Sequence, residues 1–345
     1  MEFRFETLRL TKLYPLQISR GTSTGSNNLF VFVRDGEHEG IGECAPGTGF
    51  DDTLAPLAEE QLRNLIATDL AGLSIHQIWD RAHKMEVNAS AIAALDTALW
   101  DLLGKKCGQP LYRVLGLENK AIVPTSVTIG INPVEVIRER VPEILSRTGG
   151  KALKIKLGSP EGIQRDQENY LAAAAAGQPF GVSLRVDANG GWSVADAEIM
   201  IPWLASRGCD YVEQPLARGM EDNLPRLFAN RPCPIYADES CHHALDVVKL
   251  RDRVDGINLK LMKCGGITEA LRLIATARAC GLGTMIGCMG ESSVAIAAGA
   301  ALGELFDHID LDSQINLAPD PAAGLPMVDG VVRPREVPGH GAYLA

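Results

Sequence analysis

The chain of 345 residues is 46% hydrophobic and 22% charged, and its formal net charge at pH 7 is −10. This composition is ordinary for a globular enzyme, and the acidic balance disfavours nucleic acid or an anionic membrane as the main partner. No stretch has the roughly 18 apolar residues of a membrane span, and the first residues lack the apolar core of a signal peptide. We therefore expect a cytoplasmic protein.

The N-terminal part of the sequence predicts strands followed by helices. Residues 2–13 and 29–34 read as antiparallel strands, and a third strand follows a short turn. Residues 53–118 are rich in helix formers, and Gly104 or Gly108 is expected to end the clearest helix. This order of elements is typical of an α+β domain.

Two polar, glycine-containing segments interrupt this pattern, at residues 19–28 and 46–52. The first has nothing apolar to bury, which fits a flexible hairpin loop. The alternative is a lid that closes over a ligand, with Arg20 as the cation that it carries. The second segment is open to the same two interpretations.

Asp96 and Asp101 lie in the clearest predicted helix and could be taken for catalytic residues. Carboxylates on helices are more commonly solvated, or are directed toward the helix N-terminus. We therefore expect these two side chains to have no part in a site.

From Val123 onward, apolar runs alternate with helix-like segments. We count eight strand candidates, separated by segments such as 134–145 and 267–279. The candidates are residues 123–130, 151–157, 182–187, 210–213, 234–238, 256–260, 283–288 and 308–312. Eight such units are what a closed (β/α)8-type, TIM-like barrel requires.

This pattern divides the chain into three parts. We expect an α+β capping domain at residues 1–120, a catalytic barrel at 121–323, and a C-terminal tail at 324–345 that packs back on the cap. The eight cysteines are scattered without a C-x-x-C pair, so we expect buried free thiols in a reducing compartment rather than disulfides.

Three carboxylates end successive strands of the predicted barrel. They are Asp187, Glu213 and Asp238, which are 26 and 25 residues apart. In a (β/α)8 barrel the C-terminal ends of the strands hold the active site, so these side chains should converge. Carboxylates brought together repel one another unless a cation neutralises them, and three hard oxygen ligands suit Mg²⁺ better than Zn²⁺.

Three lysines lie at the same end of the barrel. Lys154 and Lys156 are two residues apart on the second strand, so both should point into the barrel. Lys260 ends the sixth strand, on the opposite side. Ammonium groups in a mostly apolar interior are costly unless negative charge lies close. The sequence therefore predicts a metal that is flanked by an amine on each side.

This arrangement suits removal of a proton α to a carboxylate, because a metal would neutralise the enediolate that forms. A lysine base needs a pKa near 7–8, roughly three units below that of a free lysine at ~10.4. Two bases imply racemisation or epimerisation, whereas one base suffices for elimination.

The sequence resembles the enolase superfamily, in its muconate-lactonising subgroup, and is most similar to the dipeptide epimerases. The resemblance covers nearly the whole chain and rests on a series of motifs. They are Ala94-Leu95-Asp96-Thr97-Ala98-Leu99-Trp100-Asp101, Lys154-x-Lys156, Asp187-Ala188-Asn189, Glu213-Gln214-Pro215, Asp238-Glu239-Ser240 and Asn258-Leu259-Lys260. Each motif is weak alone, but all of them in order at these spacings are highly specific.

The resemblance implies that Asp187, Glu213 and Asp238 bind Mg²⁺ and that Lys156 and Lys260 are the two bases. The mandelate-racemase branch would instead carry a histidine base on its seventh strand. The corresponding strand of this sequence has no histidine, which counts against that branch.

Asp310 and Asp312 end the last predicted strand, two residues apart and therefore on one face. A solvated strand end would explain them. The other interpretation is a clamp for the α-ammonium of a substrate, since paired carboxylates attract a cation, and similar dipeptide epimerases carry a D-x-D there. The resemblance also implies that Thr128, Lys154 and Met289 line the dipeptide site.

The resemblance implies a Mg²⁺-dependent isomerase that epimerises the C-terminal residue of an L-dipeptide by two-base 1,1-proton transfer. The expected substrate is L-Ala-L/D-Glu or a related L-Ala-L-Xaa, as in peptidoglycan peptide metabolism, and Arg20 would favour an acidic side chain. The alternatives are an o-succinylbenzoate synthase or N-acylamino acid racemase-like enzyme, a cycloisomerase, or a barrel that only binds a metal or small acid. The expected partner is a small-molecule dipeptide, and homo-oligomerisation stays open.

Overall fold

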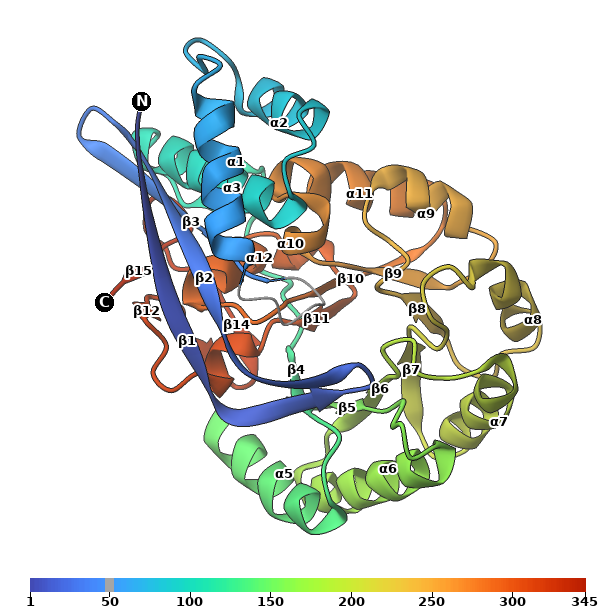
Figure 1. Ribbon diagram of the computed structural model, residues 1–345. Coiled ribbons are helices and arrows are strands. Elements are labelled where there is room, and N and C mark those ends of the chain that lie inside the picture. Colours follow the sequence, from blue (N-terminus) through green and yellow to red (C-terminus); the bar gives the residue numbers. More distant parts are fainter. Residues whose placement is uncertain (47–52) are drawn as a thin grey trace.

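The chain begins with a three-stranded antiparallel sheet in the computed structural model, which describes residues 1–46 and 53–345 (Figure 1). The strands are β1 (Glu2–Ile18), β2 (Gly21–Asp35) and β3 (His38–Cys44). The second segment predicted as a loop or lid falls, from residue 47 to residue 52, outside the described residues. The sheet approaches a helix so closely that a Cβ added to Gly42 would lie 2.0 Å from the carbonyl oxygen of Ala94.

The segment 19–28 is mostly strand, so the first of its two interpretations, a flexible loop, is wrong from Gly21 onward, whereas the lid stays a prediction. β2 pairs with β1 along this stretch, so that Thr22 lies opposite Gln17. Pairing through the backbone does not require apolar side chains, which is why the polar composition was misleading. The hairpin formed by β1 and β2 extends from the cap across one end of the barrel (Figure 1).

The sheet is followed by α1 (Leu54–Ile66), α2 (Ile75–Lys84), α3 (Ala89–Lys106) and α4 (Leu111–Val114). α3 is buried on almost all sides because it lies between the sheet and the barrel (Figure 1). Gly104 does not end this helix but lies within it, where a Cβ would come within 2.9 Å of the backbone of Gly339. Gly108, the other predicted stop, follows the helix with a positive φ of 64°.

Asp96 and Asp101 are buried, so the expectation of solvated carboxylates is wrong. Asp96 accepts hydrogen bonds from the backbone N–H and the hydroxyl of Thr268, at 2.9 and 2.6 Å. Asp101 accepts from the backbone N–H of Ile41 at 3.0 Å and from that of His340 at 2.8 Å. The two side chains thus connect α3 to the barrel, to β3 and to the C-terminal tail.

The environment of Asp96 leads to a prediction about stability. Burial raises the pKa of Asp96 to about 7, although its hydrogen bonds with Thr268 oppose the rise. The carboxyl of aspartate in an unfolded chain has a pKa of ~3.9. Between about pH 4 and pH 7, the folded state therefore keeps a proton on Asp96 that the unfolded state has lost. The wild type therefore loses stability as pH rises from about 4 to about 7, whereas an Asp96→Asn variant lacks this loss.

We expect the Asp96→Asn variant to gain up to about 3 kcal/mol relative to the wild type between pH 5 and pH 7. The free energies of unfolding of both proteins in urea, measured at these two pH values, check this result. A difference between the two proteins that stays constant with pH would contradict the buried, protonated carboxyl.

The predicted (β/α)8 barrel is confirmed. Eight parallel strands form one sheet in the order of the sequence, and a bridge between Thr125 and Ile309 brings its two edges together. The strands are β4 (Ser126–Ile129), β5 (Ala152–Lys156), β6 (Ser183–Asp187), β7 (Cys209–Glu213), β8 (Ile235–Ala237), β9 (Gly256–Leu259), β10 (Gly283–Gly287) and β11 (His308–Asp310). Each of them overlaps the range predicted for it.

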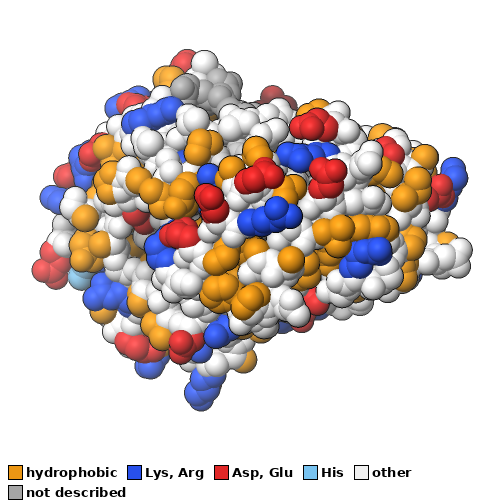
Figure 2. Space-filling model, turned by 90° about the horizontal axis from the view of Figure 1, so that it is seen from below, with side chains coloured by type: hydrophobic (Ala, Val, Ile, Leu, Met, Phe, Trp, Pro, Cys, Tyr) orange, Lys and Arg blue, Asp and Glu red, His pale blue; other side chains and the backbone are white. Residues whose placement is uncertain are grey.

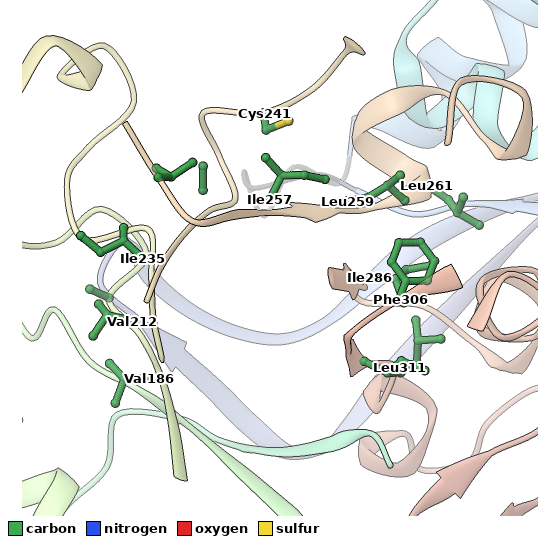
Figure 3. Packing of buried hydrophobic residues seen from close by; sticks show 14 of the residues in the cluster. Val186, Val212, Ile235, Cys241, Ile257, Leu259, Leu261, Ile286, Phe306 and Leu311 are labelled. Atoms are coloured by element: carbon green, nitrogen blue, oxygen red, sulfur yellow. The ribbon is translucent and has the colours of Figure 1, made fainter. Parts of the chain in front are cut away.

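Helices surround the strands (Figure 1). They are α5 (Val134–Thr148), α6 (Ile163–Gly177), α7 (Val194–Ala205), α8 (Leu224–Phe228), α9 (Ala244–Leu250), α10 (Leu261–Cys264), α11 (Ile267–Ala279) and α12 (Ser293–Ala300). Figure 3 shows Val186, Val212, Ile235 and Ile257, from four consecutive strands, in the hydrophobic cluster that the strands form with these helices. Short 3-10 turns occur at Gln178–Phe180, Glu221–Asn223, Gly303–Leu305 and Ser313–Asn316.

The alternation of side chains along the strands decides what faces the barrel interior. Tyr211, Tyr236 and Met285 form a small buried cluster of their own. Tyr211 and Tyr236 precede Glu213 and Asp238 by two residues, so all four share the inward face. An aromatic and apolar layer therefore supports the polar groups at the C-terminal ends of the strands.

The C-terminal tail lies against the cap. β12 (Ala322–Ala323) pairs with β15 (Tyr343–Leu344), and β13 (Met327–Val328) pairs with β14 (Val331–Val332). The carbonyl of Gly339 accepts a hydrogen bond from the N–H of Leu111 at 2.7 Å. The tail thus completes the N-terminal capping domain, as the fold prediction required.

The surface is mixed in character. Figure 2 shows one face, on which Lys and Arg alternate with Asp and Glu between groups of apolar side chains. A helix that crosses a bilayer needs both length and sustained hydropathy, and no helix in residues 1–46 and 53–345 combines them. The eight cysteines are free, and Cys107 alone is fully exposed, which agrees with the prediction of free thiols.

Candidate functional site

Three carboxylates meet at the C-terminal end of the barrel strands. Asp187 ends β6, Glu213 ends β7 and Asp238 directly follows β8, and all three are fully buried. One oxygen of each lies within 4.8 Å of the oxygens of the other two. The amide of Asn258 donates to Glu213 Oε1 at 2.7 Å and fixes that side chain. The structure therefore brings together the three residues that the sequence predicted as metal ligands.

Lysines flank this cluster. Lys156 Nζ lies 2.7 Å from Asp187 Oδ2, and Lys260 Nζ lies 2.6 Å from Asp238 Oδ2. Burial disfavours the charged form of Lys260, but the charges of Asp238 and Glu213 outweigh it, so its pKa is raised. Lys156 ends β5 and Lys260 directly follows β9, and these two strands are four apart in a ring of eight. Their ammonium groups therefore approach the cluster from opposite sides.

The donor set fits a divalent metal ion. Burial, reinforced by the charge of Asp187, raises the pKa of Glu213 to about 8. A further cation is therefore needed to keep all three carboxylates ionised at neutral pH. Oxygen-only ligands of this kind are those that Mg²⁺ prefers.

Lys154 does not line the cavity, although we expected it to line the substrate site. It is fully buried below the cavity, 2.8 Å from Glu213 Oε2 and 2.5 Å from Asp310 Oδ2. Its ammonium therefore links the carboxylate cluster to the last barrel strand. Within the described part of the chain, Lys154 is not among the residues that form the cavity wall.

A cavity of about 140 Å³ lies over the lysines. Its wall contains Lys156 and Lys260 together with Asp310 and Asp312. The remaining lining residues are Lys12, Leu16, Ile18, Arg20, Ser23, Gly25, Ser26, Pro46, Thr128, Asn189, Cys288, Met289, Gly290, Ser313 and Asn316. Five of the predicted substrate-binding residues, all but Lys154, are thus found at one cavity.

The two aspartates after β11 differ in their partners. Asp310 is held by Lys154, whereas Asp312 Oδ2 accepts a hydrogen bond from the backbone N–H of Thr128 at 2.7 Å. Burial and the charge of Asp310 raise the pKa of Asp312 to about 6. A cation placed between the two carboxylates would offset this repulsion.

Arg20 lies at the cavity, but a carboxylate already binds its guanidinium. Its Nη2 lies 2.7 Å from Glu239 Oε1, and its Nη1 donates to the carbonyl oxygen of Asn189 at 2.6 Å. The hydroxyl of Ser19 donates to the same carbonyl at 2.9 Å. These contacts hold the tip of the β1–β2 hairpin on the barrel, beside the carboxylate cluster.

Side chains of the cap hold the barrel loop that contains Met289. Glu43 is fully buried and accepts hydrogen bonds from the backbone N–H and the hydroxyl of Ser292, which begins α12. The amide of Asn28 donates to the carbonyl of Gly290 at 2.7 Å. The cap therefore shapes the loop next to the cavity.

Sequence reasoning missed several polar groups of the site. Lys263 Nζ lies 2.5 Å from Asp238 Oδ1, and its place three residues after Lys260 was a signal that could have found it. Lys12 and Asn189 line the cavity as well. Nothing local marks Lys12, because it reaches the cavity only through the packing of the cap on the barrel.

Two family models match the chain. The one described as the mandelate racemase / muconate lactonizing enzyme N-terminal domain matches residues 4–116. The one described as enolase C-terminal domain-like matches residues 136–345. Together they match most of the chain, with residues 117–135, which contain β4, outside both.

Named relatives cover the whole chain. A hydrophobic dipeptide epimerase of Roseobacter litoralis is 55% identical over 345 residues, which are 100% of this chain and 99% of the relative. A hydrophobic dipeptide epimerase of a Flavobacteria bacterium, strain MS024-2A, is 54% identical over 344 residues, 100% of this chain and 98% of the relative. The crystal structure of a dipeptide epimerase from Enterococcus faecalis, complexed with Mg and the dipeptide L-Leu-L-Tyr, matches with a TM-score of 0.88 and 31% identity over 99% of this chain and 98% of that one.

Proposed function

The chain belongs to the mandelate racemase and muconate lactonizing enzyme family of the enolase superfamily, and on this basis we propose that it is a Mg²⁺-dependent dipeptide epimerase. One observation carries the proposal: a single cavity contains Lys156 and Lys260, beside the acidic cluster, together with Asp310 and Asp312. The reaction inverts the α-carbon of the second residue of an L-dipeptide. The names of the relatives at 54% and 55% identity favour this isomerase over the lyase and cycloisomerase alternatives.

Asp187, Glu213 and Asp238 are the residues that would hold Mg²⁺. When bound, the ion supplies a positive charge that stabilises the negative charge developing on the substrate carboxylate. Lys156 and Lys260 now use the same carboxylates as ion-pair partners. Lys156 and Lys260 are thereby positioned next to the carboxylates that would hold the ion.

Lys156 and Lys260 exchange protons with the α-carbon from opposite faces. The neutral Nζ of one lysine removes the α-proton, and the charged Nζ of the other donates a proton to the other face, which inverts the centre. The roles of the two lysines are exchanged in the reverse direction. The mutual placement of β5 and β9 across the barrel is what makes inversion, rather than return of the proton to the same face, the expected outcome.

Asp310 and Asp312 hold the α-ammonium group of the dipeptide. Both line the same cavity as the two catalytic lysines. The cavity therefore offers cationic groups to the substrate carboxylate and a pair of carboxylates to its ammonium. This fixes the direction in which the peptide binds.

We expect Asp312→Asn to lower kcat/KM for L-Ala-L-Leu by roughly 10- to 100-fold, chiefly through KM, because a charged hydrogen bond to the ammonium is lost. The control is the analogue propionyl-L-Leu, which lacks the ammonium group. The wild type and the variant should process this analogue equally poorly. Equal losses on both substrates would show that Asp312 acts without contacting the ammonium.

The preferred second side chain is apolar in this proposal. Leu16, Ile18 and Pro46 contribute apolar surface to the cavity, and Glu239 occupies the guanidinium of Arg20. An acidic substrate side chain would have to compete with Glu239 for that cation. The names of the two most identical relatives described above support the same preference, over the L-Ala-L/D-Glu expected from Arg20 alone.

The test of this function is a panel of L-Ala-L-Xaa dipeptides incubated with the enzyme and Mg²⁺, followed by chiral analysis of the second residue. We expect L-Ala-D-Xaa to form fastest when Xaa is leucine, isoleucine, valine or phenylalanine, and slowly when it is glutamate. No epimerisation in any member would contradict the proposed function. Faster epimerisation of glutamate would retain the reaction and overturn the apolar preference.

The proposed setting is the cytoplasm, in the metabolism of peptides released from peptidoglycan or from proteins. The free cysteines support a reducing compartment. The proposed partner is the small dipeptide alone, without nucleic acid or membrane, which the net charge of −10 supports.

A further inference from the structure

Lys12 is a cation of the cavity that the mechanism does not use. It lies on β1, is partly buried and lines the cavity together with Asp312 and Cys288. A Cβ added to Gly290 would lie 3.7 Å from Lys12 Nζ, which places the ammonium directly beside that loop. Burial lowers the pKa of Lys12, and the nearby Cys288 and Asp312 only partly oppose this.

The backbone around Lys12 is fixed next to the segment that follows Asp312. Lys12 forms a β-bridge with Leu317, and the carbonyl of Thr11 accepts a hydrogen bond from the N–H of Ala318 at 2.9 Å. The side chain of Asn316 both accepts from the N–H and donates to the carbonyl of Tyr14, each at 2.9 Å. The cap strand is thereby tied to the segment that follows Asp312, so the backbone position of Lys12 is fixed.

The Lys12 ammonium has no fixed ionic partner. In residues 1–46 and 53–345, no carboxylate oxygen lies within 4.0 Å of its Nζ, and it makes no hydrogen bond. The other cations of the cavity are engaged, since Arg20 is bound by Glu239 and Lys156 by Asp187. Lys12 therefore contributes to the cavity wall a positive charge that no carboxylate of the described residues neutralises by direct contact.

The proposed binding direction puts the first residue of the dipeptide at this place. Its α-ammonium lies at Asp310 and Asp312, and its side chain branches from the carbon that bears the ammonium. That side chain must therefore lie among the groups around the acidic pair, which include Lys12, Cys288 and Gly290. A charge on the first side chain would interact with the Lys12 ammonium. Because both groups would be partly buried, solvent and salt would screen this interaction only weakly.

We infer that Lys12 determines which charge is accepted on the first residue of the substrate. Dipeptides with a neutral or acidic first side chain are accepted, whereas those with lysine or arginine first are repelled. This inference rests on the proposed function. It specifies the charge of the first side chain of the dipeptide, which the catalytic lysines and the metal do not contact. A specificity of this kind comes from repulsion of the wrong ligand as much as from attraction of the right one.

The test compares kcat/KM for L-Glu-L-Leu with that for L-Lys-L-Leu, with L-Ala-L-Leu as the common reference. The ratio of the first two values is determined for the wild type and for Lys12→Met, Lys12→Glu and Lys12→Arg. Because each ratio is internal to one protein, a smaller folded fraction in a variant cancels. The matched control is Lys151→Met, which removes one exposed charge at the opposite end of β5.

We expect the wild type to favour the glutamate peptide, and Lys12→Met to reduce the ratio by at least about tenfold. Lys12→Glu should favour the lysine peptide, while Lys12→Arg and Lys151→Met keep the ratio of the wild type. For a variant without turnover, the same ratio is taken from dissociation constants measured by calorimetry with Mg²⁺ present. A ratio that is unchanged in Lys12→Met and Lys12→Glu overturns the inference.

The two levels of the proposal can fail separately. If the wild type does not epimerise L-Ala-L-Leu or any other panel member, the proposed function is wrong. If it epimerises L-Ala-L-Leu but the charge ratio does not depend on residue 12, only the role of Lys12 is wrong.

Discussion

Replacement of Lys156 or Lys260 by alanine is expected to lower kcat/KM for epimerisation by at least about 10³-fold, because each lysine serves one face of the α-carbon. The loss should be asymmetric in one respect. A single remaining lysine can still remove and return a proton on its own face, so each variant should exchange the α-hydrogen of one epimer with solvent without inverting it. The two variants should exchange opposite epimers.

The measurement is ¹H NMR of L-Ala-L-Leu and of L-Ala-D-Leu in D₂O with each variant and Mg²⁺. Lys151→Ala is the control, since Lys151 is exposed and lies at the other end of β5. Exchange of the same epimer by both variants would contradict the placement of the two bases on opposite faces. Retention of epimerisation in either variant would contradict its role as a base.

The second large effect is expected from removal of the metal. Treatment with a chelator should lower turnover by at least about 10³-fold, and added Mg²⁺ should restore it in the wild type. Glu213→Gln should have the same low turnover and should not recover with Mg²⁺, because one of the three charged ligands is lost. Mg²⁺ should raise the Tm of the wild type, since a ligand that binds only the folded state stabilises it, and should leave that of Glu213→Gln nearly unchanged.

The control for this variant is Asp210→Asn, which changes an exposed carboxylate at the start of the same strand, β7. It should respond to chelator and Mg²⁺ as the wild type does. Mg²⁺-dependent turnover in Glu213→Gln, with the Tm response of the wild type, would contradict the metal site formed by Asp187, Glu213 and Asp238.

The barrel could be predicted because its signals are local and repeated. Val186 and Asp187 illustrate them: an apolar residue that packs against the helices is followed by a polar one that faces the barrel interior. The same alternation places Glu213 and Asp238 at equivalent positions on the next strands. Since parallel strands end at a common edge, the convergence of these groups followed from the order of the elements.

The cap was less predictable because its structure depends on distant partners. The polar residues after Gly21 become a strand by pairing with β1, which their composition did not indicate. Asp96 and Asp101 look like surface residues until Thr268 and His340, more than 170 residues away, are placed beside them. A single helix gives no sign of which carboxylates its tertiary partners will bury.

The residues of the candidate site likewise divide into those that local sequence patterns predict and those that depend on distant partners. Residues that the barrel positions by strand register, such as Lys156 and Lys260, were found from spacing alone. The partner of Arg20 was missed, because the hairpin that carries Arg20 meets Glu239 only through the docking of the cap on the barrel. In our proposal, substrate preference depends on these contacts between the cap and the barrel, and the expected preference for glutamate is replaced by an apolar one.

The central claim is that this protein inverts the α-carbon of the second residue of a dipeptide by two-base proton transfer. The most direct test is to incubate the wild-type enzyme with Mg²⁺ and L-Ala-L-Leu in D₂O and to analyse the early product. The proposal predicts L-Ala-D-Leu that carries one deuterium at the leucine α-carbon, while the remaining L-Ala-L-Leu is still largely protonated. Deuterium that enters L-Ala-L-Leu without formation of the D epimer, or no deuterium in either, would contradict it.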